Sequence, residues 1–269
     1  MKYETVHNLT LPKIGFGTWK IGGESSPNPK VDSVSLAALR SALELGYTHI
    51  DTAEMYAAGH TEELIGQVIR EMHIKRESLF ITSKVLPTHL RYDQVLTACE
   101  ASLRRLQMDY VDLYLIHWPS AGMKLEDTFR ALNKLVKDGK VKHLGVSNFD
   151  VKLLKQSQAF SETPIITNQV PYSISDQSYV KNSVLEYCQQ NNILLTAYSP
   201  IDAGRLNVKA PLKNIAKAHN ATPHQIALVW LIQQPRVITI PMSFNPIHIK
   251  ENFEAADLIL TDEEMKQLS

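Results

Sequence analysis

Apolar runs alternate with amphipathic segments along most of this 269-residue chain. Runs such as Val111–His117 are largely apolar, which is typical of strands that are covered on both faces. Segments such as Tyr92–Leu106 instead repeat their apolar residues at helical spacing. The pattern predicts eight strands, at Lys13–Trp19, His49–Ile50, Leu79–Val85, Val111–His117, Lys142–Asn148, Ile165–Val170, Ile193–Ser199 and Val237–Pro241.

Capping residues mark the ends of the predicted helices. Gly46 follows Val34–Leu45 in the position of a left-handed cap. Thr222 and Gln225 form a capping box around Pro223 at the first helical position. Helices are predicted at Val34–Leu45, from a Thr61 cap, at Tyr92–Leu106, at Glu126–Asp138 before Gly139, from an Asp150 cap, at Ser178–Gln190, from Thr222, from Asn245–Pro246 and from a capping box at Thr261 and Glu264.

This alternation predicts a (β/α)8 TIM barrel. A single domain over residues 1–269 is expected because no Pro-, Ser- or Gly-rich linker divides the pattern. Thr5–Val6 and Leu11–Pro12 flank a polar turn and predict a short amino-terminal β-hairpin. A short carboxyl-terminal helix is expected at the other end. The irregular stretch Pro200–Leu212 is expected to be a loop over the barrel mouth.

Composition narrows the class of protein further. The chain has 28 basic and 28 acidic residues, so its charge gives no reason to expect a nucleic acid or an anionic membrane as partner. Its first residues lack the features of a signal peptide, and no apolar run is long enough to span a bilayer. Cys99 and Cys188 fall on apolar faces of predicted helices, so buried thiols are expected rather than a disulfide or a metal site. We expect a cytoplasmic protein.

Four polar side chains stand at or just beyond the ends of three predicted strands. They are Asp51, Tyr56, Lys84 and His117. The carboxyl ends of parallel barrel strands open to the same side, so these side chains are expected to meet there. Asn148 ends a further strand at the same side.

These four groups suit proton donation to a carbonyl oxygen. A phenol has an ordinary pKa of about 10, and a neighbouring ammonium favours the phenolate. Lys84 could supply that ammonium and bring the pKa of Tyr56 closer to the working pH, with Asp51 holding the lysine in place. His117 could align the substrate oxygen or pass a proton. Such a donor fits the alkoxide that hydride addition to a carbonyl produces.

Each of these residues also has a purely structural interpretation. Asp51 could cap a turn, Tyr56 could be a half-buried loop aromatic, and Lys84 could be a solvated charge. His117 beside Trp118 could be a core histidine. Their shared position at the carboxyl ends of separate strands favours a common site.

The motifs DTAEMY, ITSK, LIHWP, GVSNF, NQVPYS, AYSP and IPMSFNP occur in this order. With them the chain resembles the aldo-keto reductases, from GFGTW to the last helix. The resemblance implies reduction of aldehydes and ketones, and in reverse alcohol oxidation, with Asp51, Tyr56, Lys84 and His117 as the catalytic tetrad and Tyr56 as the general acid. It also implies a nicotinamide cofactor, NADP with NAD possible, bound extended across the barrel mouth. GFG at Gly15–Gly17 is not the turn of a Rossmann fold.

The resemblance further implies residues that contact cofactor and substrate. Ser147, Asn148 and Gln169 would hold the carboxamide, although Asn148 could instead cap the helix near Asp150. Tyr198 would stack on the nicotinamide ring. Trp19 and Trp118 would wall the substrate pocket, although Trp118 could also be core. The remaining implied cofactor positions are Thr18, then Ser199 and Ile201 along the pyrophosphate, and Ser243, Phe244, His248, Glu251 and Asn252 near the adenosine end.

Two departures from the family pattern bear on specificity. Met242 and His248 stand where relatives usually carry a lysine and an arginine that grip the 2′-phosphate of NADP, so weaker discrimination against NAD is expected. Lys250 could restore part of that grip. The sequence also stops at Ser269, without the long tail that covers the substrate in many relatives, so an open pocket is expected.

Two other classes of protein deserve comparison. A barrel that binds nicotinamide cofactor as a sensor or partner subunit, without turnover, would not need the complete tetrad. A metal-dependent hydrolase would need more histidines and acids at strand ends than His117 and Asp51 provide. The expected partner is therefore a small aldehyde or ketone, and the expected state is a monomer or weak homo-oligomer with no bound metal.

Overall fold

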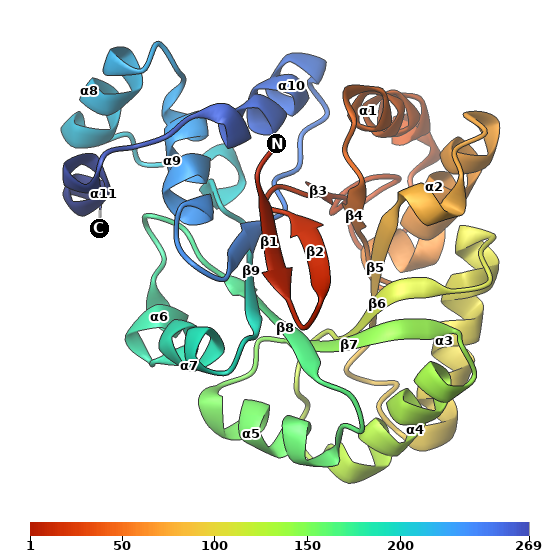
Figure 1. The fold of residues 1–269 in the computed structure, drawn as a ribbon. Helices are drawn as coiled ribbons and strands as arrows, with labels where there is room; N and C mark the ends of the chain where they lie inside the picture. Colours follow the sequence, from red (N-terminus) through yellow and green to blue (C-terminus); the bar gives the residue numbers. More distant parts are fainter. Residues whose placement is uncertain (269) are drawn as a thin grey trace.

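In the computed structural model, which describes residues 1–268, eight parallel strands form one curled sheet. Each strand pairs with its neighbour in the sequence, and a ring of helices surrounds the sheet (Figure 1). The predicted barrel is confirmed. Its strands are β3 (Phe16–Gly17), β4 (His49–Asp51), β5 (Phe80–Val85), β6 (Val111–Ile116), β7 (Val141–Ser147), β8 (Ile165–Pro171), β9 (Leu194–Tyr198) and β10 (Val237–Thr239).

The barrel closes between the segment before β3 and β10. Ile14 bridges Thr239 in parallel, and Gly15 N donates to Thr239 O at 2.8 Å. Only Phe16–Gly17 of the predicted strand Lys13–Trp19 is a regular strand, and Ile14 pairs with β10 through an isolated bridge. A Cβ on Gly17 would lie 2.5 Å from the Ile240 carbonyl oxygen, so glycine is required where the two backbones approach.

The predicted hairpin is formed by β1 (Tyr3–Val6) and β2 (Leu9–Pro12), and it lies across the barrel opening that faces the viewer in Figure 1. Val6 and Leu11 pack inside the barrel against apolar residues of β6, β8, β9 and β10. Because the amino end is plugged, any site in the barrel must open at the carboxyl ends of the strands.

Most helices begin and end where the capping pattern predicts. Asp150 Oδ1 accepts from Leu153 N, and Gly46 has φ +98° after the first helix. The helices are α1 (Asp32–Leu45), α2 (His60–Glu71), α3 (Tyr92–Leu106), α4 (Leu125–Lys137), α5 (Val151–Phe160), α6 (Ser178–Lys181), α7 (Val184–Gln190), α8 (Ala210–Ala218), α9 (Pro223–Ile232), α10 (Pro246–Glu254) and α11 (Asp262–Leu268). The short 3-10 helices are η1 (Pro29–Val31), η2 (Tyr56–Gly59), η3 (Arg76–Ser78), η4 (Asp202–Gly204) and η5 (Ala255–Asp257).

Three predictions about the helices were wrong. Thr61 does not cap α2, because its hydroxyl donates instead to Ile21 O at 2.6 Å. The segment Ser178–Gln190 is two helices, separated at Ser183, whose φ is +60°. The predicted loop Pro200–Leu212 contains η4 and the start of α8, a helix that the pattern did not reveal.

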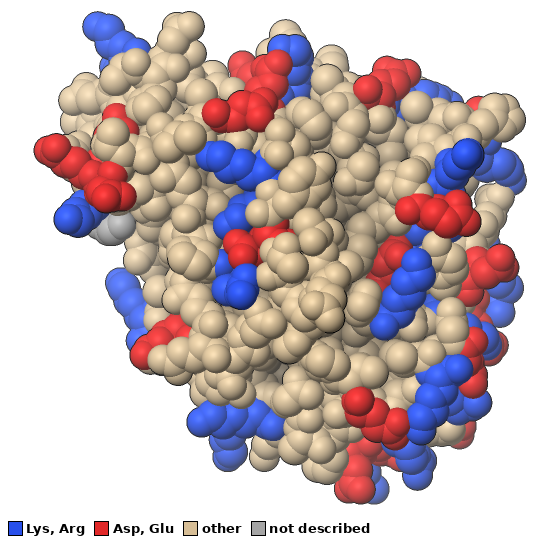
Figure 2. Space-filling model, in the orientation of Figure 1, with Lys and Arg blue, Asp and Glu red and all other residues tan. Residues whose placement is uncertain are grey.

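Both cysteines are free and buried, as predicted, and burial raises the pKa of each thiol to about 12. On the face seen in Figure 2, acidic and basic side chains are interspersed, so this face is neither predominantly acidic nor predominantly basic. Within residues 1–268, none of the helices is long and apolar enough to cross a membrane.

Candidate active site

The four predicted tetrad residues meet at the carboxyl end of the barrel. Asp51 is the last residue of β4, and Lys84 lies near the end of β5. His117 directly follows β6, and Tyr56 opens η2 in the loop after β4. Parallel pairing of β4, β5 and β6 brings these strand ends to one level, as the sequence predicts.

Lys84 is the centre of the group and is fully buried. Its ammonium donates to Asp51 Oδ1 at 2.5 Å, to Thr52 O at 2.8 Å and to the Tyr56 hydroxyl at 3.2 Å. Gln169 Nε2 donates to the other Asp51 oxygen at 2.8 Å. The lysine therefore has a partner for each of its protons, and one of those partners is the phenol.

Burial and charge act in opposite directions on the titration of this group. Burial raises the pKa of Tyr56 above its ordinary value, although Lys84 opposes that shift. Lys84 thus acts in the predicted direction, but desolvation outweighs it, so the pKa of Tyr56 does not come closer to the working pH as the sequence analysis expected. Burial would lower the pKa of Lys84, but Asp51 and Tyr56 raise it overall. At neutral pH the phenol therefore holds its proton beside a charged ammonium.

His117 completes the group as a neutral imidazole. Burial, helped by Lys84, lowers its pKa to about 2. Its ring lies 5.7 Å from the Tyr56 ring and stacks on Trp118 at 3.9 Å between centroids. Among the described residues its buried Nδ1 has no hydrogen-bond partner. A buried N–H without an acceptor is costly, so we place the proton on Nε2, which can donate to a molecule in the cavity.

The tetrad opens into a cavity of about 810 Å³ that runs from Asp51, Tyr56 and His117 to the first turns of α9 and α10. Trp19, 36% exposed, packs against the Tyr56 ring at 5.0 Å and lines the cavity together with Trp118. The structure thus brings both predicted substrate residues into the cavity that Tyr56 lines. Further predicted residues that line this cavity are Thr18, Gln169, Tyr198, Ser199, Ile201, Ser243, Phe244, His248, Glu251 and Asn252.

Ser147 and Asn148 lie outside the cavity lining and bond to residues that form it. Ser147 Oγ donates to Gln169 O at 2.8 Å. Asn148 accepts from the Tyr198 hydroxyl at 2.9 Å and donates to His117 O at 3.1 Å. In this structure these two side chains position Tyr198, Gln169 and His117.

Several lining residues were missed by sequence reasoning, at the α9 end of the cavity and at the tetrad end. Thr222 and His224 begin α9, and the residues that contribute from the tetrad end are Lys20 and Met55. The Thr222 capping box was recognised as a helix start, but nothing in its pattern indicated that the helix points into the site. Lys250, which could restore part of the phosphate grip, lies outside the cavity lining and pairs with Glu254 at 2.5 Å.

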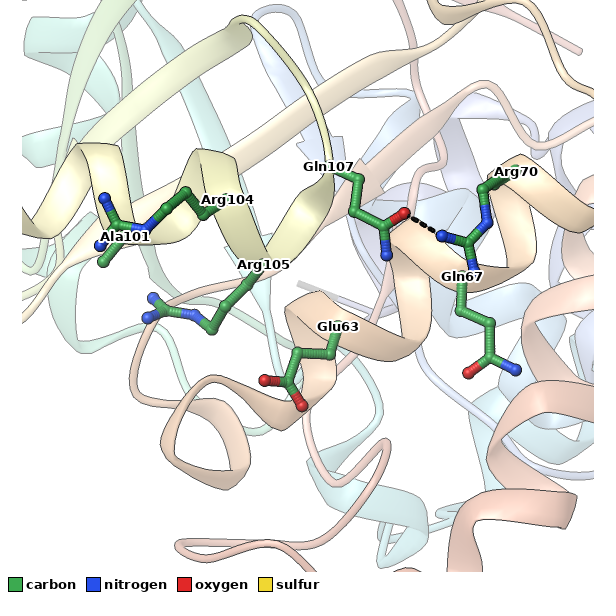
Figure 3. Close-up of a pocket in the computed structure, with 7 residues that line it drawn as sticks. All are labelled: Glu63, Gln67, Arg70, Ala101, Arg104, Arg105 and Gln107. Atoms are coloured by element: carbon green, nitrogen blue, oxygen red, sulfur yellow. Dashed lines mark hydrogen bonds between the residues drawn. The ribbon is translucent and has the colours of Figure 1, made fainter.

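A second cavity, of about 540 Å³, lies on the outer layer between α2 and α3 (Figure 3). Gln67 and Arg70 lie beside Gln107 at one end, and Arg104 and Arg105 lie at the other. Arg105 is held by the buried carboxylate of Glu62, with Nε donating at 2.7 Å. This pocket contains no tetrad residue, and the Arg105 guanidinium in it is already paired with the buried Glu62 carboxylate.

Comparison with known proteins identifies the family. The sequence model of the Aldo/keto reductase family matches residues 13–269. The chain belongs to that family. It is 38% identical to methylglyoxal reductase YeaE of Escherichia coli, over 97% of this chain and 91% of the relative. It is 45% identical to the thermostable aldo-keto reductase Tm1743, crystallised with the inhibitor epalrestat, with a TM-score of 0.96 over 100% of this chain and 98% of that one.

A Klebsiella pneumoniae aldo-keto reductase solved with NADP and acetate is 37% identical, with a TM-score of 0.88 over 99% of this chain and 94% of that one. The lining of the cavity in the present protein offers groups that suit such a dinucleotide. Tyr198 offers an aromatic face near the tetrad, and Gln169 keeps its amide oxygen free to accept. Hydroxyl, amide and imidazole donors line the other end, at Ser243, Asn252 and His248.

Proposed function

We propose that this protein reduces aldehydes and ketones with NADP(H) as cofactor, and oxidises the corresponding alcohols in reverse. The observation that carries the proposal is the contact between the buried Lys84 ammonium and the Tyr56 hydroxyl, at the edge of a cavity of about 810 Å³. Membership of the Aldo/keto reductase family supports the same reaction. When bound, the reduced cofactor supplies the hydride.

The tetrad residues have separate roles in this proposal. Tyr56 donates its proton to the carbonyl oxygen as that oxygen gains negative charge. Lys84 stabilises the phenolate left behind, and Asp51 keeps Lys84 charged and oriented. His117, neutral and carrying its proton on Nε2, donates a hydrogen bond that aligns the carbonyl.

The proposed cofactor contacts keep the sequence expectation except at Ser147 and Asn148, which were expected to hold the carboxamide themselves. Gln169 and Tyr198 hold and face the nicotinamide, and Ser147 and Asn148 support them from outside the cavity. NADP is the preferred cofactor, with NAD possible. Thr18, Ser199 and Ile201 lie toward the middle of the dinucleotide, and the adenosine end lies at Ser243, Phe244, His248, Glu251 and Asn252.

We infer that small aldehydes, including 2-oxoaldehydes, are the substrates. Trp19 and Trp118 line the same cavity as Tyr56, and a 38% identical relative is named a methylglyoxal reductase. A monomer or weak homo-oligomer in the cytoplasm, acting without nucleic acid, is an expectation from the sequence. So is the organisation of residues 1–269 as one domain.

A single assay tests the reaction. Purified protein is mixed with NADPH and either methylglyoxal or an aromatic aldehyde, and the absorbance of the reduced nicotinamide is followed. We expect oxidation that depends on the aldehyde. Tight binding of NADPH without any oxidation would instead indicate a barrel that senses or carries the cofactor.

A further inference from the structure

The turn that carries Tyr56 has an unusual backbone. In η2, Ala57 and Ala58 have φ values of +48° and +53°, and Gly59 follows at +94°. Residues other than glycine rarely adopt this left-handed conformation, and they keep it only where their surroundings hold them in place. Because these residues directly follow Tyr56, the contacts that hold the turn also hold the phenol.

The turn contacts two distant parts of the chain. Ala57 N donates to Glu24 O, in the loop between β3 and α1, at 3.0 Å. Gly59 lies against Arg105, which is in the outer layer between α2 and α3 (Figure 3). A Cβ on Gly59 would lie 2.5 Å from Arg105 Nε and 2.7 Å from Arg105 Cδ. The turn therefore packs directly on the side chain of this arginine.

Arg105 is itself fixed by a buried carboxylate. Its Nε donates to Glu62 Oε2 at 2.7 Å, and Glu62 is fully buried in α2. The other oxygen of Glu62 accepts from Ser83 Oγ at 2.6 Å. Ser83 directly precedes Lys84 on β5. One carboxylate thus joins the arginine that supports the Tyr56 turn to the strand that carries Lys84.

We propose that Arg105, held by Glu62, is a positioning residue that sets the place of the Tyr56 hydroxyl beside Lys84. This inference rests on the proposed function, because it takes Tyr56 as the proton donor. Arg105 is not among the residues that line the large cavity, so it acts through the turn and not on cofactor or substrate. Misplacing a reacting group by about 1 Å can cost roughly 10²-fold in rate.

The alternative is that Arg105 serves only the stability of the fold. Gly66 of α2 packs on the Leu106 carbonyl of α3, so the two helices are closely packed beside Arg105. The two possibilities predict different results. Loss of stability lowers the fraction of folded protein, whereas loss of positioning lowers the rate constant of the folded, NADPH-bound protein.

The test is a single turnover followed by stopped flow. The complex of each variant with NADPH is mixed with saturating aldehyde, and the rate constant of NADPH oxidation is measured. Unlike the amplitude, this rate constant does not depend on the folded fraction. For Arg105→Ala we expect it to fall by about tenfold to a hundredfold, with the Kd of NADPH nearly unchanged. Arg105→Lys keeps the charge and most of the stem, so it should regain most of the rate.

Arg76→Ala is the matched control. Arg76 pairs at 2.6 Å with the buried carboxylate of Asp112, at the amino ends of β5 and β6 and so at the opposite end of the barrel from Tyr56. Removing this guanidinium also leaves a buried carboxylate without its closest cation. It should therefore lower Tm, as Arg105→Ala does, while the single-turnover rate constant stays at the wild-type value.

A second pair of variants tests the same contact from the side of the turn. Gly59→Ala forces the turn and Arg105 apart, so we expect a lower rate constant. Gly139→Ala is its control, because Gly139 also has a left-handed φ, +72°, but among the described residues no atom lies within 4 Å of a Cβ built there. It should lower stability alone. This pair keeps the inference testable if Arg105→Ala does not fold.

A wild-type rate constant in Arg105→Ala, or in Gly59→Ala where Arg105→Ala does not fold, overturns the inference. So does an equal fall in Arg76→Ala or Gly139→Ala, because the effect would then follow from lost stability. Failure of the proposed function would show separately, as wild-type protein that binds NADPH and does not oxidise it with any aldehyde.

Discussion

Replacing Lys84 by Met tests two roles of one buried cation, in the stability of the fold and in catalysis. Without it, the Asp51 carboxylate, 1% exposed, keeps Gln169 as its remaining side-chain donor at 2.8 Å. Breaking a buried ion pair by removing one partner costs about 3–5 kcal/mol. For a chain of this size that corresponds to a fall in Tm of roughly 10 °C. We also expect kcat to fall by about 10²–10⁴, because nothing then stabilises the Tyr56 phenolate.

The double variant Lys84→Met/Asp51→Asn is the control. It removes both charges, so most of the lost stability should return while kcat stays low. Thermal unfolding followed by circular dichroism gives the first quantity, and steady-state oxidation of NADPH with an aldehyde gives the second. A single variant that melts like wild type, or a double variant that regains activity, would refute this account of the ion pair.

Three further predictions follow from the cavity and the buried histidines. In fluorescence titrations, Met242→Lys/His248→Arg should lower the Kd of NADPH by about one to two decades and leave the Kd of NADH nearly unchanged. An equal fall in both values would mean that the 2′-phosphate is bound elsewhere. His117→Gln should lower kcat without moving the acidic limb of the pH–rate profile, because burial holds the pKa of His117 at about 2. Burial also lowers the pKa of His49 to about 4, whereas a histidine in the unfolded chain has a pKa of about 6.5. As the pH falls from about 6.5 to about 4, the unfolded state therefore binds a proton that the folded state does not. The free energy of unfolding should fall by up to roughly 3 kcal/mol over that range. Urea unfolding at about pH 7 and about pH 4.5 measures this difference in stability, and His49→Gln should make it smaller. An unchanged difference would mean that other groups cause the loss of stability.

The barrel could be predicted from the sequence because hydrophobic periodicity is local and repeats with every unit. Tyr92–Leu106 was predicted to the residue, since its apolar stripe and its neighbours in sequence both specify a helix. The prediction for Thr61 failed because its hydroxyl bonds to Ile21 O, forty residues away, which no local pattern reveals. Helix α8 was missed because few apolar residues, among them Leu212 and Ile215, mark its buried face.

The tetrad was predictable for a different reason, namely that each member ends or follows its own strand. What the sequence could not give was burial. The direction of the Tyr56 pKa shift depends on how completely the ring is desolvated, and that follows from packing against Trp19 and Lys84. The positions of His224 and Asn148 relative to the cavity also depend on how their elements are placed in space.

The most direct test of the account is the single substitution Tyr56→Phe. It removes only the hydroxyl that Lys84 contacts at 3.2 Å, and it keeps the ring that packs on Trp19. We predict that kcat for aldehyde reduction falls by about 10²–10⁴ while the Kd of NADPH stays nearly unchanged. A variant that retains most of its kcat would show that the proton comes from another group, and would contradict the central claim.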